Sequence, residues 1–107
     1  MAYKVILGEL AKQDIRDNYQ FILEKERSKR LAKHWYSAVM DSIKSLRDFP
    51  ESHPVIPEAA ILERELRETF IFSHRIIYSI SKKPNTIFIH RVYHGHRIPL
   101  RAKDIQD

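Results

Sequence analysis

The pattern that most constrains the fold is a stripe of mostly apolar side chains at helical spacing between residues 28 and 50. The stripe consists of Leu31, Trp35, Ala38, Val39, Ser42, Ile43, Leu46 and Phe49. Residues spaced three and four apart share one face of an α-helix. Ser28 is a suitable N-cap, and Pro50 is expected to end the helix. We therefore expect an amphipathic helix that places Trp35 and Phe49 in the core.

A second helical pattern precedes this one. From Glu9 onward, apolar residues recur at helical spacing with charged residues between them: Ala11, Ile15, Tyr19, Ile22 and Leu23. The pattern is lost in the charged run EKERSKR. Two amphipathic helices joined by a short turn should form an antiparallel hairpin. Such a hairpin must bury its apolar stripe against another element.

Strand-like runs flank the helical hairpin. The first is YKVIL (Tyr3–Leu7), which ends at Gly8. After the proline-rich loop FPESHPVIPEAA come three more runs: ELRETFIF, HRIIYSI and TIFIHRVYH. The last two are joined by SKKPN, a turn-rich segment suited to a β-hairpin. The order predicts a single two-layer α+β domain, residues 1–107, with an N-terminal strand, an antiparallel helical hairpin and a three-stranded antiparallel β-sheet region.

Composition excludes several classes of site. The 107 residues include no cysteine, so neither a disulfide nor a thiolate metal site can form. The histidines near the C-terminus come without neighbouring carboxylates, and we expect no metal and no cofactor. We find no signal peptide in the opening residues MAYKVILGEL, and no apolar run reaches membrane-spanning length. We expect a cytoplasmic protein with no membrane partner.

Positive charge is concentrated towards the C-terminus. Residues 69–103 contain seven Lys and Arg residues and no Asp or Glu, whereas residues 1–68 contain twelve of each sign. A field of one sign attracts polyanions, either nucleic acid or an acidic protein. Because side chains alternate across a strand, burying Ile76 and Tyr78 against the helices leaves Arg75 on the open face. The flanking runs add Arg67, His90, Arg91, His94, His96 and Arg97.

Two points stay open at this stage. The register of the last strand decides whether His90 or Arg91 joins Arg75, since a slip of one residue exchanges them. A salt bridge from Arg75 to Glu65 or Glu68 is the alternative to a binding role for this arginine.

Two motifs stand on the last predicted strands. Residues 74–78 read His-Arg-Ile-Ile-Tyr, and residues 94–97 read His-Gly-His-Arg. With the element order and the opening YKVILGELAKQDIRDNYQFI, they resemble the RelE/ParE superfamily of toxins from bacterial type II toxin–antitoxin (plasmid stabilisation) systems. The similarity covers nearly the whole chain. Members often show Tyr-Arg-x-x-Tyr followed by His-Gly-x-Arg, so His74 departs from the usual first tyrosine.

The resemblance implies a toxin that a cognate antitoxin holds inactive by wrapping it with an extended, often acidic segment. RelE-like members cut messenger RNA on the ribosome, which requires a base, an acid and cations that stabilise the phosphorane. If the chain is such an endoribonuclease, the resemblance implies Arg75, Arg97 and His94 as its catalytic residues. ParE-like members instead inhibit DNA gyrase through protein contacts and are not enzymes.

The end of the chain favours the ParE-like interpretation. Many RelE-like enzymes have a late tyrosine or histidine, whereas IPLRAKDIQD follows Arg97 here and contains no tyrosine. His94 or His96 is the alternative that could take its place. We therefore expect gyrase as the target, with the ribosome and messenger RNA as the alternative. In both cases we expect contacts to the target or the antitoxin from Arg67, Arg75, Arg91, His96 and Arg97.

Overall fold

The computed structural model describes residues 3–82, 84–95 and 100–105. Its main elements are β1 (Lys4–Leu7), α1 (Glu9–Glu26), α2 (Lys29–Ser45), β2 (Arg67–Ile71), β3 (His74–Lys82) and β4 (Asn85–His94). Three short elements were not predicted from the sequence: a 3-10 turn at Pro50–Ser52, helix α3 (Ala59–Leu62) and a second 3-10 turn at Ala102–Asp104. The predicted α+β fold class is confirmed. None of the described helices combines the length and apolar character that a membrane crossing needs.

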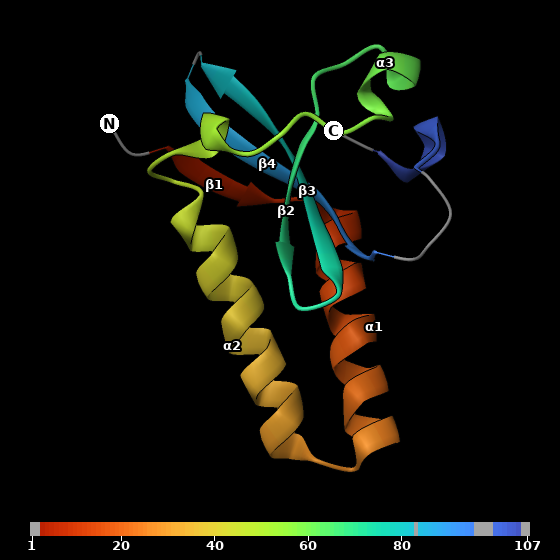
Figure 1. Ribbon diagram of the computed structural model, residues 1–107. Coiled ribbons are helices and arrows are strands. Elements are labelled where there is room, and N and C mark those ends of the chain that lie inside the picture. The colour runs from red at the N-terminus through yellow and green to blue at the C-terminus, as the bar shows by residue number, and fades with distance from the viewer. Residues whose placement is uncertain (1–2, 83, 96–99, 106–107) are drawn as a thin grey trace.

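The four strands form one mixed sheet in the order β1-β4-β3-β2 (Figure 1). The three later strands are antiparallel, as predicted, while β1 adds to β4 in parallel with Val5 opposite Ile87. Gly8 makes the sharp passage from β1 into α1. Its N–H donates to the carbonyl of Ile89 at 2.9 Å, and a Cβ here would lie 2.7 Å from Cε1 of Phe88. This close approach to the sheet is why the position suits glycine.

The helical hairpin follows its sequence signals except at its end. Ser28 caps α2, since its Oγ accepts a hydrogen bond from the Leu31 N–H at 3.1 Å. Trp35 is buried, as predicted. Phe49 is 76% exposed, so its placement in the core was wrong. The reason is that α2 ends at Ser45, and beyond a helix end the helical spacing no longer fixes the face of a side chain.

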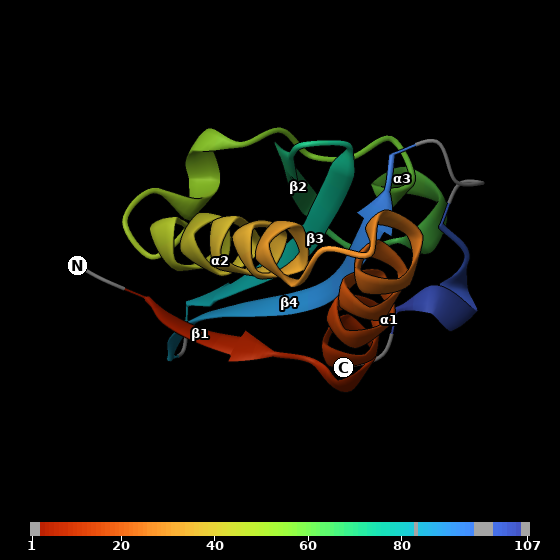
Figure 2. The ribbon, with the colours of Figure 1, turned by 90° about the horizontal axis from the view of Figure 1, so that it is seen from below.

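The main core lies between the hairpin and one face of the sheet. In Figure 1 the two helices extend beyond the β2–β3 turn, and in Figure 2, which is seen from below, α2 and α1 lie in front of the strands. The buried residues of this core are Ala11, Ile15, Trp35, Val39, Ile43, Leu46, Ile76, Tyr78, Ile87, Ile89 and Val92. Alternation along β3 therefore works as predicted, with Ile76 and Tyr78 in this core.

The opposite face of the sheet is not open, which corrects the prediction that it would be. A second buried cluster covers it: Ile56, Ala59, Leu66, Ile77, Tyr93 and Leu100. The covering segments are the loop with α3 and the C-terminal turn, and both approach β3 and β4 from this side. Ile77 and Tyr93 are large side chains on the second face, so leaving them in water would expose a sizeable apolar surface.

Candidate functional site

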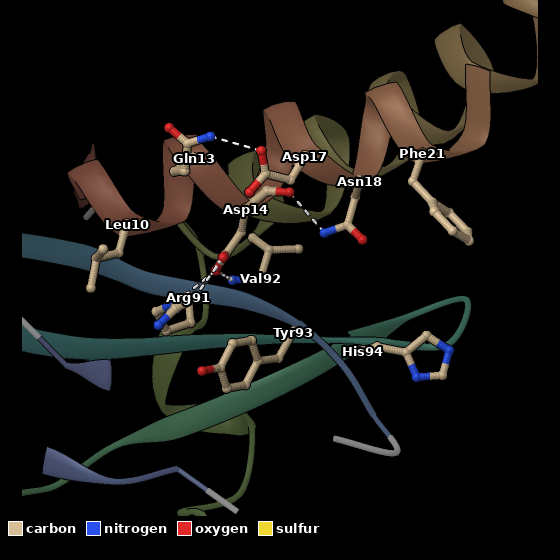
Figure 3. A pocket seen from close by; sticks show the side chains of 10 residues that line it. All are labelled: Leu10, Gln13, Asp14, Asp17, Asn18, Phe21, Arg91, Val92, Tyr93 and His94. Atoms are coloured by element: carbon tan, nitrogen blue, oxygen red, sulfur yellow. Dashed lines mark hydrogen bonds and ion pairs between the residues drawn. The ribbon is translucent and has the colours of Figure 1, made fainter. Parts of the chain in front are cut away.

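A groove of about 590 Å³ lies between α1 and the end of β4 (Figure 3). It is lined by Leu10, Gln13, Asp14, Asp17, Asn18, Phe21, Arg91, Val92, Tyr93 and His94. The pairing of β1 with β4 stops at Leu7 and Ile89, so beyond this point α1 runs beside β4 where a strand would otherwise lie. We call this cavity the α1/β4 groove.

Asp14 is the link between helix and strand in the α1/β4 groove. It is 9% exposed, and its Oδ2 accepts a hydrogen bond at 2.9 Å from the Val92 N–H, which has no strand partner on this side. The same carboxylate binds Arg91 through two contacts of 2.7 Å, from Nε and Nη2. These bonds raise the pKa of Arg91. A bidentate pair of this kind fixes the guanidinium in place.

Arg91 is also held from the other side. Its Cζ lies 4.4 Å from the ring centroid of Tyr93, and its Nη1 lies 3.6 Å from Oδ1 of Asp104. Burial would raise the pKa of Asp104, but hydrogen bonds from the Arg101 N–H and the Tyr93 hydroxyl, with the charges of Arg101 and Arg91, outweigh burial and lower it. The guanidinium of Arg91 is therefore balanced by carboxylates on both sides.

The predicted catalytic histidine His94 lies at the mouth of the α1/β4 groove. It is exposed at the end of β4, and its ring lies 5.4 Å from that of His74. His74 is buried against Trp35, and its Nε2 shares a hydrogen bond of 3.2 Å with Oδ1 of Asn18 on α1. His94 lines the groove and His74 packs against the main core, so the contact between their rings links the two regions.

Arg75 lies elsewhere, on the second face of the sheet. It lies on the face of the sheet that alternation predicts, but it is only 9% exposed. The prediction that Arg75 is exposed on an open face was therefore wrong. Its Nε donates to Glu68 at 2.6 Å, and Nη1 and Nη2 donate to Glu58 at 3.0 and 3.1 Å. The cause is the covering segment, because Glu58 precedes α3 and also accepts the Leu100 N–H. The salt bridge to Glu68 was the alternative interpretation of this residue.

The hydrogen bonds around Arg75 act on both partners. Burial would lower the pKa of Arg75, but its bonds to Glu58 and Glu68 outweigh burial and raise it. The bonds from Arg75 lower the pKa of Glu58 against the effect of burial. Both partners are thus held in their charged forms, and each of the three guanidinium nitrogens donates to a carboxylate.

Of the other predicted site residues, Arg67 is the one that the structure describes. Arg67 holds the preceding loop by donating to the carbonyls of Glu51 and His53 at 3.2 and 2.6 Å. His96 and Arg97 lie outside the described residues. The structure brings His94 and Arg91 to one groove but keeps Arg75 and Arg67 apart from it.

The sequence left open whether His90 or Arg91 lies on the same face of the sheet as Arg75, and the structure places both there. An irregularity between Ile77 and Tyr78 shifts the pairing, so that Ile77 lies opposite Arg91 and Tyr78 lies opposite Ile89. A bulge of this kind leaves one residue of β4 without an opposite partner. As a result His90 bonds Ser79 at 2.8 Å while Arg91 stacks on Tyr93, and both contacts lie on the second face.

Three of the four acids that bind Arg75 and Arg91 were missed from the sequence, whereas Glu68 was named as an alternative partner. Asp14, Glu58 and Asp104 lie far along the chain from their partners. One signal was available for Asp14, which stands three residues after Ala11 and next to Ile15, and so on the buried side of its helix. Among the described charged residues of the α1/β4 groove, two aspartates accompany one arginine. The groove therefore suits neutral or cationic groups better than a polyanion.

Comparisons with known proteins bear on the family and the fold of the chain. A family model described as "ParE toxin of type II toxin-antitoxin system, parDE" matches residues 5–99. No curated protein matches significantly. Among solved structures, the chromosomal ParDE toxin–antitoxin system of P. aeruginosa aligns with a TM-score of 0.69 at 11% identity, covering 87% of this chain and 96% of that one.

A second solved structure is the RelBE2 toxin–antitoxin complex of Mycobacterium tuberculosis. It aligns with a TM-score of 0.60 at 19% identity, covering 88% of this chain and 99% of that one. At these identities the two structures establish the fold, and the family model spans most of the sequence. The chain belongs to the ParE toxin family of type II toxin–antitoxin systems.

Proposed function

We propose that this protein is a toxin that inhibits DNA gyrase through protein contacts and is neutralised by a cognate antitoxin. The observation that carries the proposal is the family match over residues 5–99. The contacts of Arg75 support it. In a ribosome-dependent nuclease, a strand arginine must offer its donors to a phosphate. Here each nitrogen of the Arg75 guanidinium already donates to Glu58 or Glu68.

An antitoxin partner follows from the relatives. Both solved neighbours are toxin–antitoxin systems by their own descriptions. The net charge of this chain is +5, which favours binding to an acidic partner. We propose that the cognate antitoxin is such a protein.

The test of gyrase inhibition uses toxin that has been freed of antitoxin. We expect an equimolar amount to block the supercoiling of relaxed plasmid by purified gyrase, and added antitoxin to restore it. Since a basic protein could also inhibit by coating DNA, relaxation by topoisomerase I on the same plasmid is the control and should be unaffected. Full supercoiling at a clear excess of toxin would refute the proposal.

Ribosome-dependent cleavage of messenger RNA is the second candidate. Two observations favour it: the RelBE2 complex aligns over nearly the same share of the chain, and His94 is exposed at the mouth of the α1/β4 groove. Histidine is the side chain that most often transfers protons in catalysis. Growth arrest with a DNA-damage response supports gyrase as the target, whereas immediate arrest of translation supports this second candidate.

A further inference from the structure

The turn between α1 and α2 carries a concentration of positive charge that plays no part in the α1/β4 groove. Residues 24–33, which we call the hairpin tip, contain two glutamates and five cations: Lys25, Arg27, Lys29, Arg30 and Lys33. The net charge of +3 in this stretch is more than half of the +5 of the whole chain. In Figure 1 the hairpin tip projects past the β2–β3 turn, away from the strands.

The five cations of the hairpin tip are exposed and are not neutralised. None of them forms an ion pair in the part of the chain that the structure describes. Lys25 lies over the exposed ring of Phe21, with its Nζ 5.4 Å from the centroid. Of the two acids, Glu24 accepts a hydrogen bond at 2.8 Å from Gln20, one turn back along α1. The positive charge of the tip is therefore available to a partner.

The cations of the hairpin tip stand where the helices themselves do not favour them. Lys29 and Arg30 begin α2 and Lys33 follows in its second turn, while the first turn contains no acid. The helix macrodipole is positive at this end, so cations here oppose it. Arg27 ends α1 with a left-handed backbone, φ 49° and ψ 39°, which glycine or asparagine adopts with less strain. Proteins break such local rules mostly at functional sites.

The composition of the hairpin tip favours phosphates over a protein surface as its partner. Protein interfaces are built around buried apolar anchors, and lysine is depleted in them. Of the two apolar residues in this described stretch, Ala32 is fully buried and Leu31 is 37% exposed. The tip therefore presents long, flexible cations with little apolar surface between them. Such side chains suit the backbone of a nucleic acid, whose phosphates are contacted without regard to sequence.

We propose that the hairpin tip binds the phosphate backbone of the duplex DNA that gyrase holds, an inference that rests on the proposed function. Non-specific binding to a DNA backbone is weak on its own, with a Kd of about 10⁻⁴–10⁻⁶ M at physiological salt. Protein contacts with gyrase raise the local concentration of the tip beside the DNA and make this contact effective. The toxin therefore binds the gyrase–DNA complex more tightly than gyrase alone, and it does not coat free plasmid.

Removing charge from the hairpin tip provides the first test, in which toxin binding to purified gyrase is measured with and without a linear duplex. We expect the duplex to tighten binding of the wild type by about ten-fold at low salt, and Lys29→Gln with Arg30→Gln to lose most of this gain. With DNA present, the slope of log Kd against log salt should fall by about 2 in this variant. Because the substitutions remove cations from the positive end of a helix, the variant should fold at least as stably as the wild type.

Lys44→Gln with Arg47→Gln is the matched control. It also removes one lysine and one arginine, from exposed positions at and just beyond the opposite end of α2. The gain from DNA should stay within about two-fold of the wild type in this control. Equal losses in both double variants would show a general charge effect and overturn the inference. A loss for the tip variant that is equally large without DNA would show a contact with gyrase itself and overturn it as well.

Photocrosslinking provides the second test and separates failure of the inference from failure of the proposed function. Toxin with p-benzoylphenylalanine in place of Leu31 should crosslink to a labelled duplex in the complex with gyrase. The same residue in place of Phe49, which is exposed beyond the other end of α2, should not. Toxin that inhibits gyrase but crosslinks from position 31 to protein only, or not at all, would overturn the inference and leave the proposed function standing. Wild-type toxin that binds neither gyrase nor the gyrase–DNA complex would overturn both.

Discussion

The arginines of the sheet and the cations of the helical hairpin are both numerous, but they have different surroundings. In the sheet, the side chains of Arg75 and Arg91 are 11% and 12% exposed, and each contacts two carboxylates. In the hairpin, Arg16 and Lys33 are exposed along an apolar groove. The two sheet arginines are thus neutralised by folding, while the mixed segment leaves cations at its surface.

The largest effect on stability should come from removing Arg75. In Arg75→Met, Glu58 and Glu68 would remain buried without their cation, and breaking a buried ion pair costs about 3 kcal/mol or more. The free energy of unfolding, measured with urea, should fall by that amount. Lys25→Met, at an exposed lysine on α1, is the control and should stay within about 0.5 kcal/mol. A loss below about 1 kcal/mol for Arg75→Met would mean that this arginine is not structural.

The next largest effect should come from Asp14. In Asp14→Ala, both Arg91 and the Val92 N–H lose their acceptor, so we expect a loss of about 2–3 kcal/mol in the same measurement. Asp17→Ala offers a matched control on the same helix, because Asp17 is exposed and bonds only the side chain of Gln13 among the contacts described. Similar losses in the two variants would contradict the role given to Asp14.

A smaller loss is expected at the passage from β1 to α1. In Gly8→Ala the new methyl group would lie 2.7 Å from the ring of Phe88 and 2.8 Å from the carbonyl of Ile89, so one of them must move. Overpacking of this kind costs about 1–3 kcal/mol. Gly95→Ala is the milder comparison, since its nearest contact would be 3.2 Å from the Ser73 carbonyl. Equal stability of Gly8→Ala and wild type would show that β1 and α1 can shift freely.

The smallest effect concerns pH. The pKa values of Glu58 and Asp104 are lowered in the folded protein from 4.5 and 3.8. Folding therefore gains from these carboxylates above the unfolded values, and the gain is lost as the pH falls below about 4.5. Urea unfolding from pH 7 to pH 3 should show a steeper decline for the wild type than for Glu58→Gln. Parallel curves for the two proteins would mean that Glu58 does not contribute to the pH dependence of stability.

Much of the fold could be predicted from the sequence, because apolar spacing reports directly which side of an element is buried. The hairpin, the cap at Ser28 and the strand alternation that separates Ile76 from Arg75 all follow from it. The cover over the second face could not be predicted in this way. α3 has four residues, too few to show a periodic pattern, and Glu58 meets Arg75 only through tertiary contacts.

The candidate site was predictable in part for a related reason. Residue type identified Arg91 and His94 as candidates, and both line the α1/β4 groove. Residue type does not reveal, however, which side chains an arginine contacts in the folded protein. Asp14 and Asp104 were therefore not recognised as partners of Arg91, and the positive electrostatic field of the strand segment was overestimated. The bulge that places both His90 and Arg91 on the second face also has no sequence signature here, since it requires no glycine.

Primer extension on a message translated in the presence of the toxin tests most directly whether the sheet arginines serve the fold and not RNA cleavage. The toxin sample should first be shown to inhibit gyrase, so that its folding and activity are established. We predict the same pattern of stops with and without the toxin, because Glu58 and Glu68 occupy Arg75. New stops in phase with codons would contradict this interpretation and identify the protein as a ribosome-dependent endoribonuclease.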